Sequence, residues 1–221
     1  MKPERTLSAD EARRFYDAFG ARQDSQAFYE DPPNRDLAAH LELGEASALF
    51  ELGCGTGRLA AELLERELPA TCRYHGVDLS STMVELARAR LARFGERARV
   101  TLGDASLALP AQSGSCDRFL STYVFDLLSR ADIERAVEEA QRVLRPGGLA
   151  GLTGLTFGRD LLGRAVSTLW TAVHRLSPRR VGGCRPLDLE PWFRAPAWKL
   201  EYLERHRVSG LTSQVLVARR L

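Results

Sequence analysis

Apolar and polar positions along the chain follow two different periods. Short apolar runs of strand length alternate with longer stretches in which apolar residues recur every three or four positions. The short runs are typical of buried strands, and the longer stretches are typical of amphipathic helices. Strands and helices that alternate in this way predict a parallel sheet with helices on its faces. The expected strands are 46–52, 73–77, 97–102, 116–123 and 149–155, and the expected helices between them are 58–67, 81–94 and 133–144.

The pattern before the first strand predicts two more helices. Residues 8–19 are amphipathic, and Ser8 with Glu11 forms a capping-box pair at their start. A polar and aromatic stretch follows at 20–34 and ends in a proline pair and an asparagine. A short helix is expected at 36–43.

The pattern changes again after the last of these strands. A long helix is expected at 160–176, and a loop rich in Arg, Gly and Pro follows at 177–194. Two alternating segments, around 199–208 and 212–219, are separated by Ser209-Gly210 and predict an antiparallel hairpin. One wide face of the long helix collects Leu161, Leu162, Ala165, Val166, Leu169, Trp170 and Val173.

Length and composition describe an ordinary globular chain. Its 221 residues fit one domain, and 44% hydrophobic with 27% charged residues is typical of a globular protein. The net charge of +2 gives no indication of a nucleic-acid partner. The charge is uneven, however, because residues 157–221 carry 12 Lys and Arg against 5 Asp and Glu. This basic third either attracts an acidic substrate or an anionic surface, or is a solvated surface of arginines.

The cysteines favour neither a metal site nor a disulfide scaffold. Cys54, Cys72, Cys116 and Cys184 contain no Cys-x-x-Cys pair, and each lies in or near an expected core element. They are typical of small buried apolar side chains in a reducing compartment. The first residues are charged and lack an apolar signal segment, and no apolar run is long enough to span a bilayer. We therefore expect no metal, no membrane span and a cytoplasmic location.

Three alternating glycines follow the first expected strand. Residues 50–59 are Phe-Glu-Leu-Gly-Cys-Gly-Thr-Gly-Arg-Leu, and a helical pattern continues from there. A turn without Cβ atoms allows backbone N–H groups to approach a ligand, and the helix N-terminus adds partial positive charge. The pattern predicts a small-molecule cradle, with a ligand-free strand–helix turn as the alternative.

Two other kinds of glycine-rich loop do not fit this segment. A phosphate-binding loop ends in Gly-Lys-Ser/Thr, whereas Gly57 is followed by Arg58. A dinucleotide fingerprint needs Gly-x-Gly-x-x-Gly, whereas the third glycine here comes one residue early. The spacing Glu-x-Gly-x-Gly-x-Gly from Glu51 to Gly57 instead resembles motif I of the class I S-adenosylmethionine-dependent methyltransferases.

Three further segments strengthen this resemblance, which covers about residues 46–155. Residues 76–80, Gly-Val-Asp-Leu-Ser, resemble the family's second motif, and Gly103-Asp104-Ala105 resembles the motif that reaches the adenine amino group. Residues 144–148, Leu-Arg-Pro-Gly-Gly, match the family's turn after a helix. The resemblance implies an α/β, Rossmann-like fold with a seven-stranded, mostly parallel sheet, a C-terminal antiparallel hairpin and helices on both faces.

The resemblance also implies S-adenosyl-L-methionine as the cofactor, with S-adenosyl-L-homocysteine as its product. Ligands of open α/β sheets bind beyond the carboxyl ends of the strands, and there Asp78 would accept hydrogen bonds from the ribose diol. Met83 would pack on the adenine or in the core, and Glu51 would bond the loop backbone or the methionine amine. The expected cofactor residues are Glu51, Gly53, Cys54, Gly55, Gly57, Asp78, Leu79, Met83, Asp104, Ala105 and Ser121.

The acceptor side is less defined than the cofactor side. Aromatic residues before the sheet resemble the segment that covers the cofactor in related small-molecule enzymes, although they would equally pack on the sheet edge. The strand end at 121–126 lacks the Asn/Asp-Pro-Pro-Tyr/Phe motif of the DNA-methylating branch, so we expect no DNA partner. Arg179, Arg180 and Arg185 are candidates to bind a carboxylate or a phosphate. The candidates for catalysis, each with plain packing as the alternative, are Tyr16, Tyr29, Tyr123, Asp126 and His174.

One function is favoured and two others stay open. The first hypothesis is a methyltransferase that moves a methyl group by in-line displacement to a small acidic or lipid-like molecule, as a monomer or homodimer. The alternatives are a non-catalytic, cofactor-binding regulatory protein and an RNA or protein methyltransferase. A single domain over 1–221 would divide into a helical lid (1–43), a cofactor-binding core (44–156), an acceptor-side insertion (157–196) and the hairpin (197–221).

Overall fold

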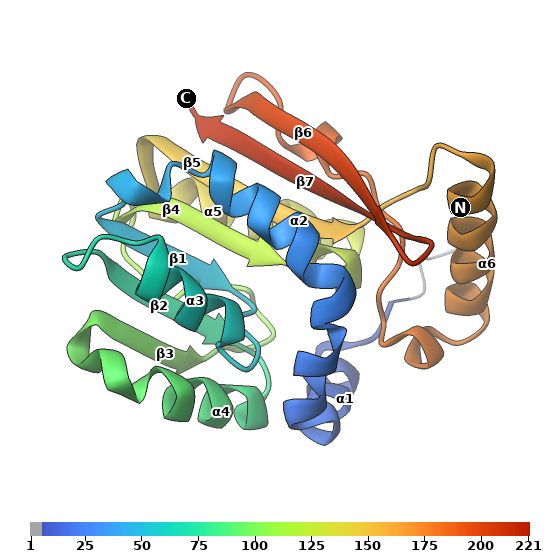
Figure 1. Ribbon diagram of the computed structural model, residues 1–221, viewed down its shortest axis with the longest axis horizontal. Helices are drawn as coiled ribbons and strands as arrows, with labels where there is room; N and C mark the ends of the chain where they lie inside the picture. Colours follow the sequence, from blue (N-terminus) through green and yellow to red (C-terminus); the bar gives the residue numbers. More distant parts are fainter. Residues whose placement is uncertain (1–5) are drawn as a thin grey trace.

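Seven strands form one sheet in a computed structural model that describes residues 6–221 (Figure 1). Their order is β3-β2-β1-β4-β5-β7-β6; the first five strands pair in parallel, and β7 pairs antiparallel with both β5 and β6. The Rossmann-like sheet with a C-terminal antiparallel hairpin is therefore confirmed. The strands are β1 (Ala48–Leu52), β2 (Arg73–Asp78), β3 (Ala98–Leu102), β4 (Cys116–Thr122), β5 (Leu144–Leu155), β6 (Trp198–Val208) and β7 (Leu211–Arg220).

The expected turn at 145–148 lies inside β5 as an irregularity. Cys116 of β4 pairs with Leu144, and the next paired residue, Arg118, faces Leu149. Four residues of β5, 145–148, therefore lie opposite one residue of β4. The three extra residues bulge out of the ladder where the sequence places Pro-Gly-Gly, because proline has no N–H to donate and Gly147 adopts a φ of 80°.

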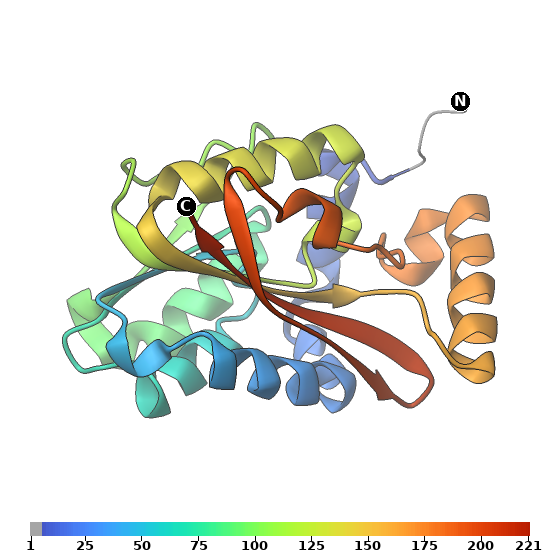
Figure 2. The same ribbon diagram turned by 90° about the horizontal axis from the view of Figure 1, so that it is seen from above.

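Helices cover both faces of the sheet (Figure 2). On one face α2 (Ala27–His40), α3 (Arg58–Arg66) and α4 (Ser81–Leu91) bury Leu37, Leu64 and Val84 against strand residues such as Leu49. On the other face α5 (Arg130–Val143) packs with residues 187–198 against Phe50 and its neighbours. Leu49 and Phe50 are adjacent in β1 and lie in different cores, because successive side chains of a strand alternate between its faces.

Helix α2 differs from the expected structure of this region. A short 3-10 helix covers Gly20–Gln26, and α2 then runs from Ala27 straight through the proline pair to His40. Its inner side fits β5 closely, since a Cβ on Gly151 would lie 2.9 Å from the nearest atoms of Leu37 and Leu41. Burial of these leucines outweighs the local preference of the prolines, so the expected start at residue 36 is wrong by nine residues.

The remaining helices lie at the edge of the sheet. The capping box of α1 (Ala9–Phe19) is confirmed, because Ser8 Oγ accepts from the Glu11 N–H and the Glu11 carboxylate accepts from the Ser8 N–H. Helix α6 (Leu161–Leu176) stands to one side of the sheet (Figures 1 and 2). No helix within residues 6–221 is both long and apolar enough to cross a membrane.

The exposed side of α6 carries leucines, and its buried side carries small and polar residues. The buried residues of this helix are Gly163, Ser167 and His174, whereas Leu161 is 88% exposed and Leu169 is 67% exposed. The leucines of the apolar face, with Ala165, thus point to solvent, whereas Val166, Trp170 and Val173 of the same face are half-buried. The polar side is held inward by the loop that follows the helix, as described below.

Candidate active site

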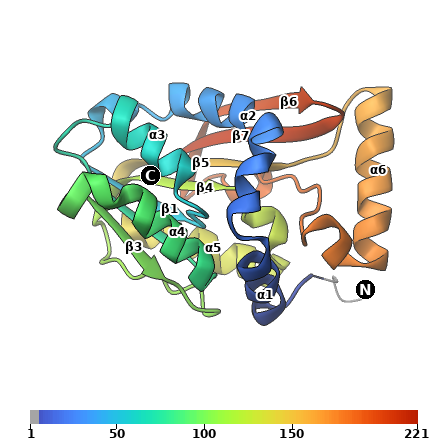
Figure 3. The same ribbon diagram turned by 60° about the horizontal axis from the view of Figure 1, so that its bottom comes forward.

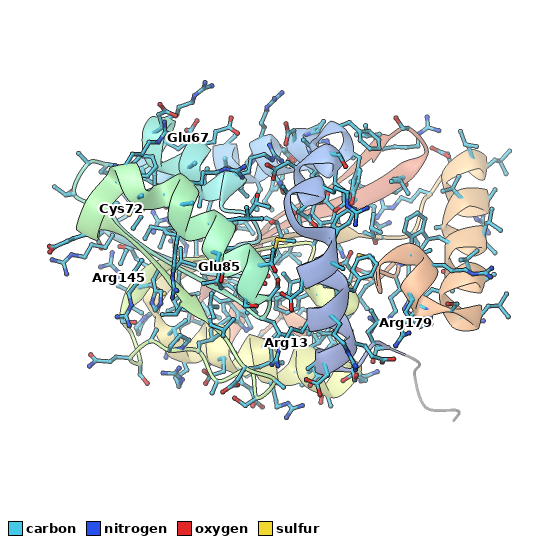
Figure 4. All side chains as sticks on the ribbon, turned by 90° about the horizontal axis from the view of Figure 1, so that it is seen from below. Arg13, Glu67, Cys72, Glu85, Arg145 and Arg179 are labelled. Carbon is cyan, nitrogen blue, oxygen red and sulfur yellow. The ribbon has the colours of Figure 1, made fainter. Side chains whose placement is uncertain are left out.

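A cavity of about 230 Å³ opens at the carboxyl ends of the parallel strands. Its floor is formed by the glycine loop after β1, by residues 77–80 after β2, and by segments 103–109 and 122–124. Helix α1 and the first turns of α2 cross this end of the sheet and line the opposite side (Figure 3). Figure 4 shows Arg13 of α1, which also lines the cavity, on the side of α1 that is nearer to α4.

The glycine loop is tied to the end of β2 by its own amides. The N–H groups of Gly53 and Cys54 donate to the Val77 carbonyl at 2.7 and 3.1 Å. The N–H of Gly55 donates to Asp78 Oδ2 at 2.9 Å. These three amides were expected to face a ligand, but the structure uses them inside the protein, where they hold the loop in one shape before any ligand binds.

Two of the three glycines are required by close packing. A Cβ on Gly53, whose φ is 79°, would lie 2.1 Å from Val124 Cγ2, and one on Gly57 would lie 3.0 Å from the Ala87 backbone. A Cβ on Gly55 would meet nothing within 4 Å, and Gly55 lines the cavity. Gly55 therefore leaves open space beside the backbone, which is the room that a closely approaching ligand needs.

The carboxylate of Asp78 accepts hydrogen bonds from two backbone N–H groups. Its Oδ1 accepts from the Ser80 N–H at 2.9 Å, while Oδ2 accepts from Gly55. Desolvation raises the pKa of Asp78, and the backbone donors oppose that change. The side chain lines the cavity, and each carboxylate oxygen has a second lone pair, so Asp78 can still accept hydrogen bonds from a diol.

Asp104 and Glu51 both line the cavity, but Asp104 is exposed to solvent and Glu51 is buried. Asp104 is exposed at the rim, where hydrogen bonds from the Ser106 side chain and backbone lower its pKa. Glu51 is 1% exposed and accepts the Tyr74 hydroxyl at 2.5 Å. Desolvation raises the pKa of Glu51 to about 7. At neutral pH, Asp104 is ionised and Glu51 is divided between its two protonation states.

Nine of the eleven expected cofactor residues line this one cavity: Glu51, Gly53, Cys54, Gly55, Asp78, Leu79, Met83, Asp104 and Ala105. The other two do not. Gly57 caps α3 and packs on α4, and Ser121 is fully buried, with its hydroxyl donating to the Leu52 carbonyl at 2.9 Å. Both of these residues hold the loop and the sheet together around the cavity.

Three of the five catalytic candidates meet at one side of the cavity. Tyr16, Tyr29 and Tyr123 all line it, and the Tyr29 ring meets the Tyr123 ring edge-to-face with centroids 5.6 Å apart. The Tyr123 hydroxyl donates to Ser213 Oγ at 2.9 Å, and its backbone has a φ of 55°, which is unusual for a bulky residue. Burial raises the pKa of all three phenols, so they are neutral at physiological pH.

The other two candidates lie away from the cavity wall. Asp126 is 1% exposed, and its Oδ2 accepts from the Leu155 N–H at 3.2 Å; desolvation raises its pKa to about 6. His174 lies on α6, where its Nε2 is 3.2 Å from the Gly183 carbonyl. Of the described residues in the expected acceptor-side insertion, only Cys184 lines the cavity. The insertion contributes little because β5 delivers the chain outward into α6.

Two of the three arginines that were candidates to bind an acidic acceptor have partners elsewhere in the protein. Arg179 pairs with Glu11 of α1 at 2.8 Å, and the buried Arg185 donates to the Asp126 carbonyl at 3.1 Å. Neither of them, nor Arg180, is among the residues that line the cavity. The arginines of this segment therefore lie at the surface or hold the loop in place, and they do not face the cavity.

Two cavity residues from α2 were missed by sequence reasoning. Glu30 is 8% exposed and accepts from Gln23 Nε2 at 3.4 Å, and desolvation raises its pKa to about 7. Asn34 is buried one turn later and accepts from Thr153 Oγ1 at 2.9 Å. Their four-residue spacing, continued by Leu37 and Leu41, is a helical signal. The proline pair between Glu30 and Asn34 concealed it.

Three aspartates fasten the N-terminal segment over the cavity, and they are seven residues apart. Asp17 accepts the Ser80 hydroxyl at 2.6 Å. Asp24 pairs with Arg90 at 2.6 Å and accepts the Thr56 hydroxyl, and Asp31 pairs with Arg58 at 2.7 Å. Ser80, Thr56 and Arg58 line the cavity, and Arg90 is on α4, which contributes Met83 to the lining. The segment from α1 to the start of α2 is therefore closed by charged contacts rather than by apolar packing alone.

The central part of the chain is similar in sequence to known proteins. Residues 49–148 match the family described as a methyltransferase domain. The chain carries a class I, S-adenosylmethionine-dependent methyltransferase domain. This domain is 37% identical over 115 residues to a demethylmenaquinone methyltransferase of Thermus thermophilus, covering 52% of this chain and 50% of the relative. It is 28% identical over 149 residues to a tRNA N(3)-methylcytidine methyltransferase of Drosophila melanogaster, covering 63% and 46%.

The methyltransferase domain also has close structural neighbours. The crystal structure of the [4+2]-cyclase SpnF matches it with a TM-score of 0.73 at 18% identity, over 99% of this chain and 98% of that chain. At this identity the match shows the fold alone. The chain spans about half the length of the curated relatives that it matches.

Proposed function

We propose that this chain transfers a methyl group from S-adenosylmethionine to a small molecule with an apolar body. The observation that carries the proposal is the enclosed side of the cavity, where three tyrosines meet beside the buried Glu30 and Asn34. Ligand sites of this kind are mostly apolar with a few placed polar groups. A site closed by α1 and α2 suits a small acceptor better than a folded macromolecule.

The cavity residues fit S-adenosylmethionine. Asp78 would hold the ribose diol, Gly55 would allow the cofactor to approach the backbone, and Met83 would pack on the adenine. The bound cofactor supplies a methyl group that is already activated on a sulfonium. The chain's own contribution is to hold the acceptor in line and to exclude water, and such positioning can provide roughly 7–11 kcal/mol of barrier reduction.

Glu30 is the residue that we assign to the acceptor's proton. A hydroxyl or amine acceptor must lose a proton during transfer, and a base with a pKa near the working pH is the most effective. Glu30 lines the cavity beside Tyr29, and burial raises its pKa to about 7. Asn34 would orient the acceptor on the same helix face. Asp126 and His174 do not line the cavity.

Similarity to a demethylmenaquinone methyltransferase supports an apolar acceptor. Similarity to a tRNA methyltransferase keeps an RNA acceptor as the second candidate, and the basic final third of the chain favours it too. The two differ in their salt dependence, because RNA binding through arginines releases counterions and weakens as salt rises.

The test is product formation with defined acceptors. The purified chain is incubated with S-adenosylmethionine and, separately, with a short-chain quinol, a simple phenol, an acyl carboxylic acid and a tRNA transcript. S-adenosylhomocysteine is measured for each acceptor. We expect turnover with an apolar small molecule, and Glu30→Gln should lower its rate by roughly 10²-fold or more, with cofactor affinity unchanged. Turnover with tRNA alone would overturn the proposal in favour of the second candidate.

A further inference from the structure

Helix α6 presents a continuous apolar stripe to solvent. Leu161, Leu162, Leu169 and Leu176 are 88%, 57%, 67% and 76% exposed. Ala165 and Ala172 are also exposed and fill the gaps between the leucines, at the four- and three-residue spacing of a single helix face. An exposed stripe of this kind marks an interaction surface, since isolated surface leucines do not line up along four turns.

The inner face of α6 is already occupied by the chain itself. Trp170 Nε1 donates to the Cys184 carbonyl at 2.9 Å, and His174 lies against the Gly183 carbonyl. Gly163 and Ser167 are buried on the same side. The helix cannot turn its leucines inward without breaking these contacts, so the stripe stays exposed to solvent in the folded chain.

Arginines lie beside the stripe, and this part of the sequence contains very few acidic residues. Arg164 and Arg175 are exposed on one side of it, and Arg159 and Arg180 lie at its two ends. Arg179, next to Arg180, pairs with Glu11 of α1. Asp160 is the one acidic residue between positions 157 and 180, and it caps α6 and pairs with Arg207. The surface thus combines exposed leucines with positive charge.

We propose that this face of α6, residues 157–180, docks on an anionic lipid bilayer. The leucines would enter the boundary between headgroups and acyl chains, and the arginines would contact anionic headgroups, which is the arrangement of interfacial amphipathic helices. A second copy of the chain fits less well, because a symmetric contact through this face would bring two borders of arginines together.

Helix α6 is connected to the cavity through the loop that follows it. The helix supports the loop whose Cys184 lines the cavity, so docking at α6 would bring this part of the cavity wall toward a bilayer that holds a lipid-soluble molecule. The docking proposal itself rests on α6 alone. It is tested without cofactor or acceptor, so its outcome is separate from that of the proposed methyl transfer.

The experiment is co-sedimentation of the full chain with vesicles. One set contains phosphatidylcholine alone, and the other contains equal parts of phosphatidylcholine and phosphatidylglycerol. We expect binding to the anionic set and weak binding to the neutral set. Leu169→Glu should lower the partition coefficient by roughly tenfold or more, and Arg164→Gln by about fivefold on anionic vesicles only.

The matched control is Leu221→Glu, which alters a leucine that is 61% exposed at the C-terminus, far from α6 (Figure 1). It should bind vesicles like the wild type. All three variants should keep wild-type S-adenosylmethionine affinity by titration calorimetry, which shows that they are folded. Absence of binding to anionic vesicles, or equal loss in Leu221→Glu and Leu169→Glu, would overturn the proposal. A wild-type dimer that Leu169→Glu converts to a monomer, without vesicle binding, would assign the stripe to a second copy instead.

Discussion

At the scale of single residues, Asp78 performs two tasks with one carboxylate. It accepts the Gly55 and Ser80 amides and so fixes the glycine loop to the end of β2. It also lines the cavity, where it is the side chain we assign to the ribose hydroxyls. A change at this position therefore affects both the shape of the loop and the contact with the cofactor.

Asp78→Asn should weaken S-adenosylmethionine binding by roughly tenfold to 100-fold. The amide retains one acceptor oxygen and loses the charge, and hydrogen bonds to charged groups contribute about 1.5–3 kcal/mol. Titration calorimetry measures the affinity. Asp104→Asn should have a smaller effect because Asp104 is exposed at the rim, and Asp10→Asn, at an exposed position of α1 that does not line the cavity, should have none. Equal affinities for Asp78→Asn and Asp10→Asn would contradict the assignment.

Glu51 gives the fold a pH dependence of its own. Burial raises its pKa from the usual 4.5 to about 7 in the folded chain, so the folded chain favours the protonated form. The stability that this provides is complete below about pH 4.5 and is lost as the pH rises through about 7. Glu51→Gln keeps an acceptor for the Tyr74 hydroxyl and cannot titrate.

The unfolding free energy of the wild type, relative to Glu51→Gln, should therefore fall by roughly 2–3 kcal/mol between pH 5 and pH 8. Urea unfolding at several pH values measures both proteins without cofactor. Other carboxylates contribute equally to the two proteins and cancel in the difference. Two parallel stability profiles would mean that Glu51 does not titrate in this range.

At the scale of elements, the N-terminal segment is the part that completes the cavity. Helix α1 and the 3-10 helix Gly20–Gln26 have no fully buried residue, so apolar packing alone holds them weakly. The contacts of Asp17, Asp24 and Asp31 with the core supply the attachment. Elements with few buried apolar contacts are the ones that open most readily.

Asp24→Asn should loosen this cover without unfolding the sheet. It removes the charge that pairs with Arg90, and a charge-assisted contact of this kind contributes about 1–2 kcal/mol. Amide hydrogen exchange in residues 17–26 should speed up by roughly tenfold, and exchange in β1 and β4 should not change. Asp10→Asn is the matched control on the same segment. Faster exchange throughout the sheet would indicate general destabilisation instead.

At the scale of the whole molecule, the cavity to which we assign the cofactor joins parts that are distant in the chain. Its walls come from α1 and α2, from the ends of β1, β2 and β4, and from Cys184 in the loop after α6. A ligand that contacts all of these binds only the folded chain. Binding should therefore stabilise the protein as a unit.

Saturation with S-adenosylmethionine at about 100 times its dissociation constant should raise the melting temperature by roughly 5–10 °C. Differential scanning calorimetry measures this shift, and S-adenosylhomocysteine should produce a similar one. Asp78→Asn should reduce the shift at the same cofactor concentration. A melting temperature that does not respond to either compound would contradict a cofactor site in this cavity.

Much of the cofactor side could be predicted because it is encoded locally. The glycine spacing after β1 and the carboxylates at the ends of β2 and β3 depend on a few neighbouring residues and on the parallel order of the strands. Parallel strands bring their carboxyl ends to one edge, so these residues had to meet there. Nine of the eleven expected residues indeed line one cavity, and the sheet has the expected order and hairpin.

The side of the cavity to which we assign the acceptor was decided by contacts between distant segments. Helix α2 passes through two prolines because Leu37 and Leu41 gain burial against β5, and this carries Glu30 and Asn34 into the cavity. Helix α6 turns its leucines outward because Trp170 and His174 bond the loop that follows it, which also keeps His174 off the cavity wall. The sequence by itself determined the fold class and the cofactor edge, since local motifs and strand order suffice for them. Only the tertiary structure decided which residues of α2 line the cavity and which side of α6 faces solvent, because long-range burial and hydrogen bonding there outweigh the local pattern.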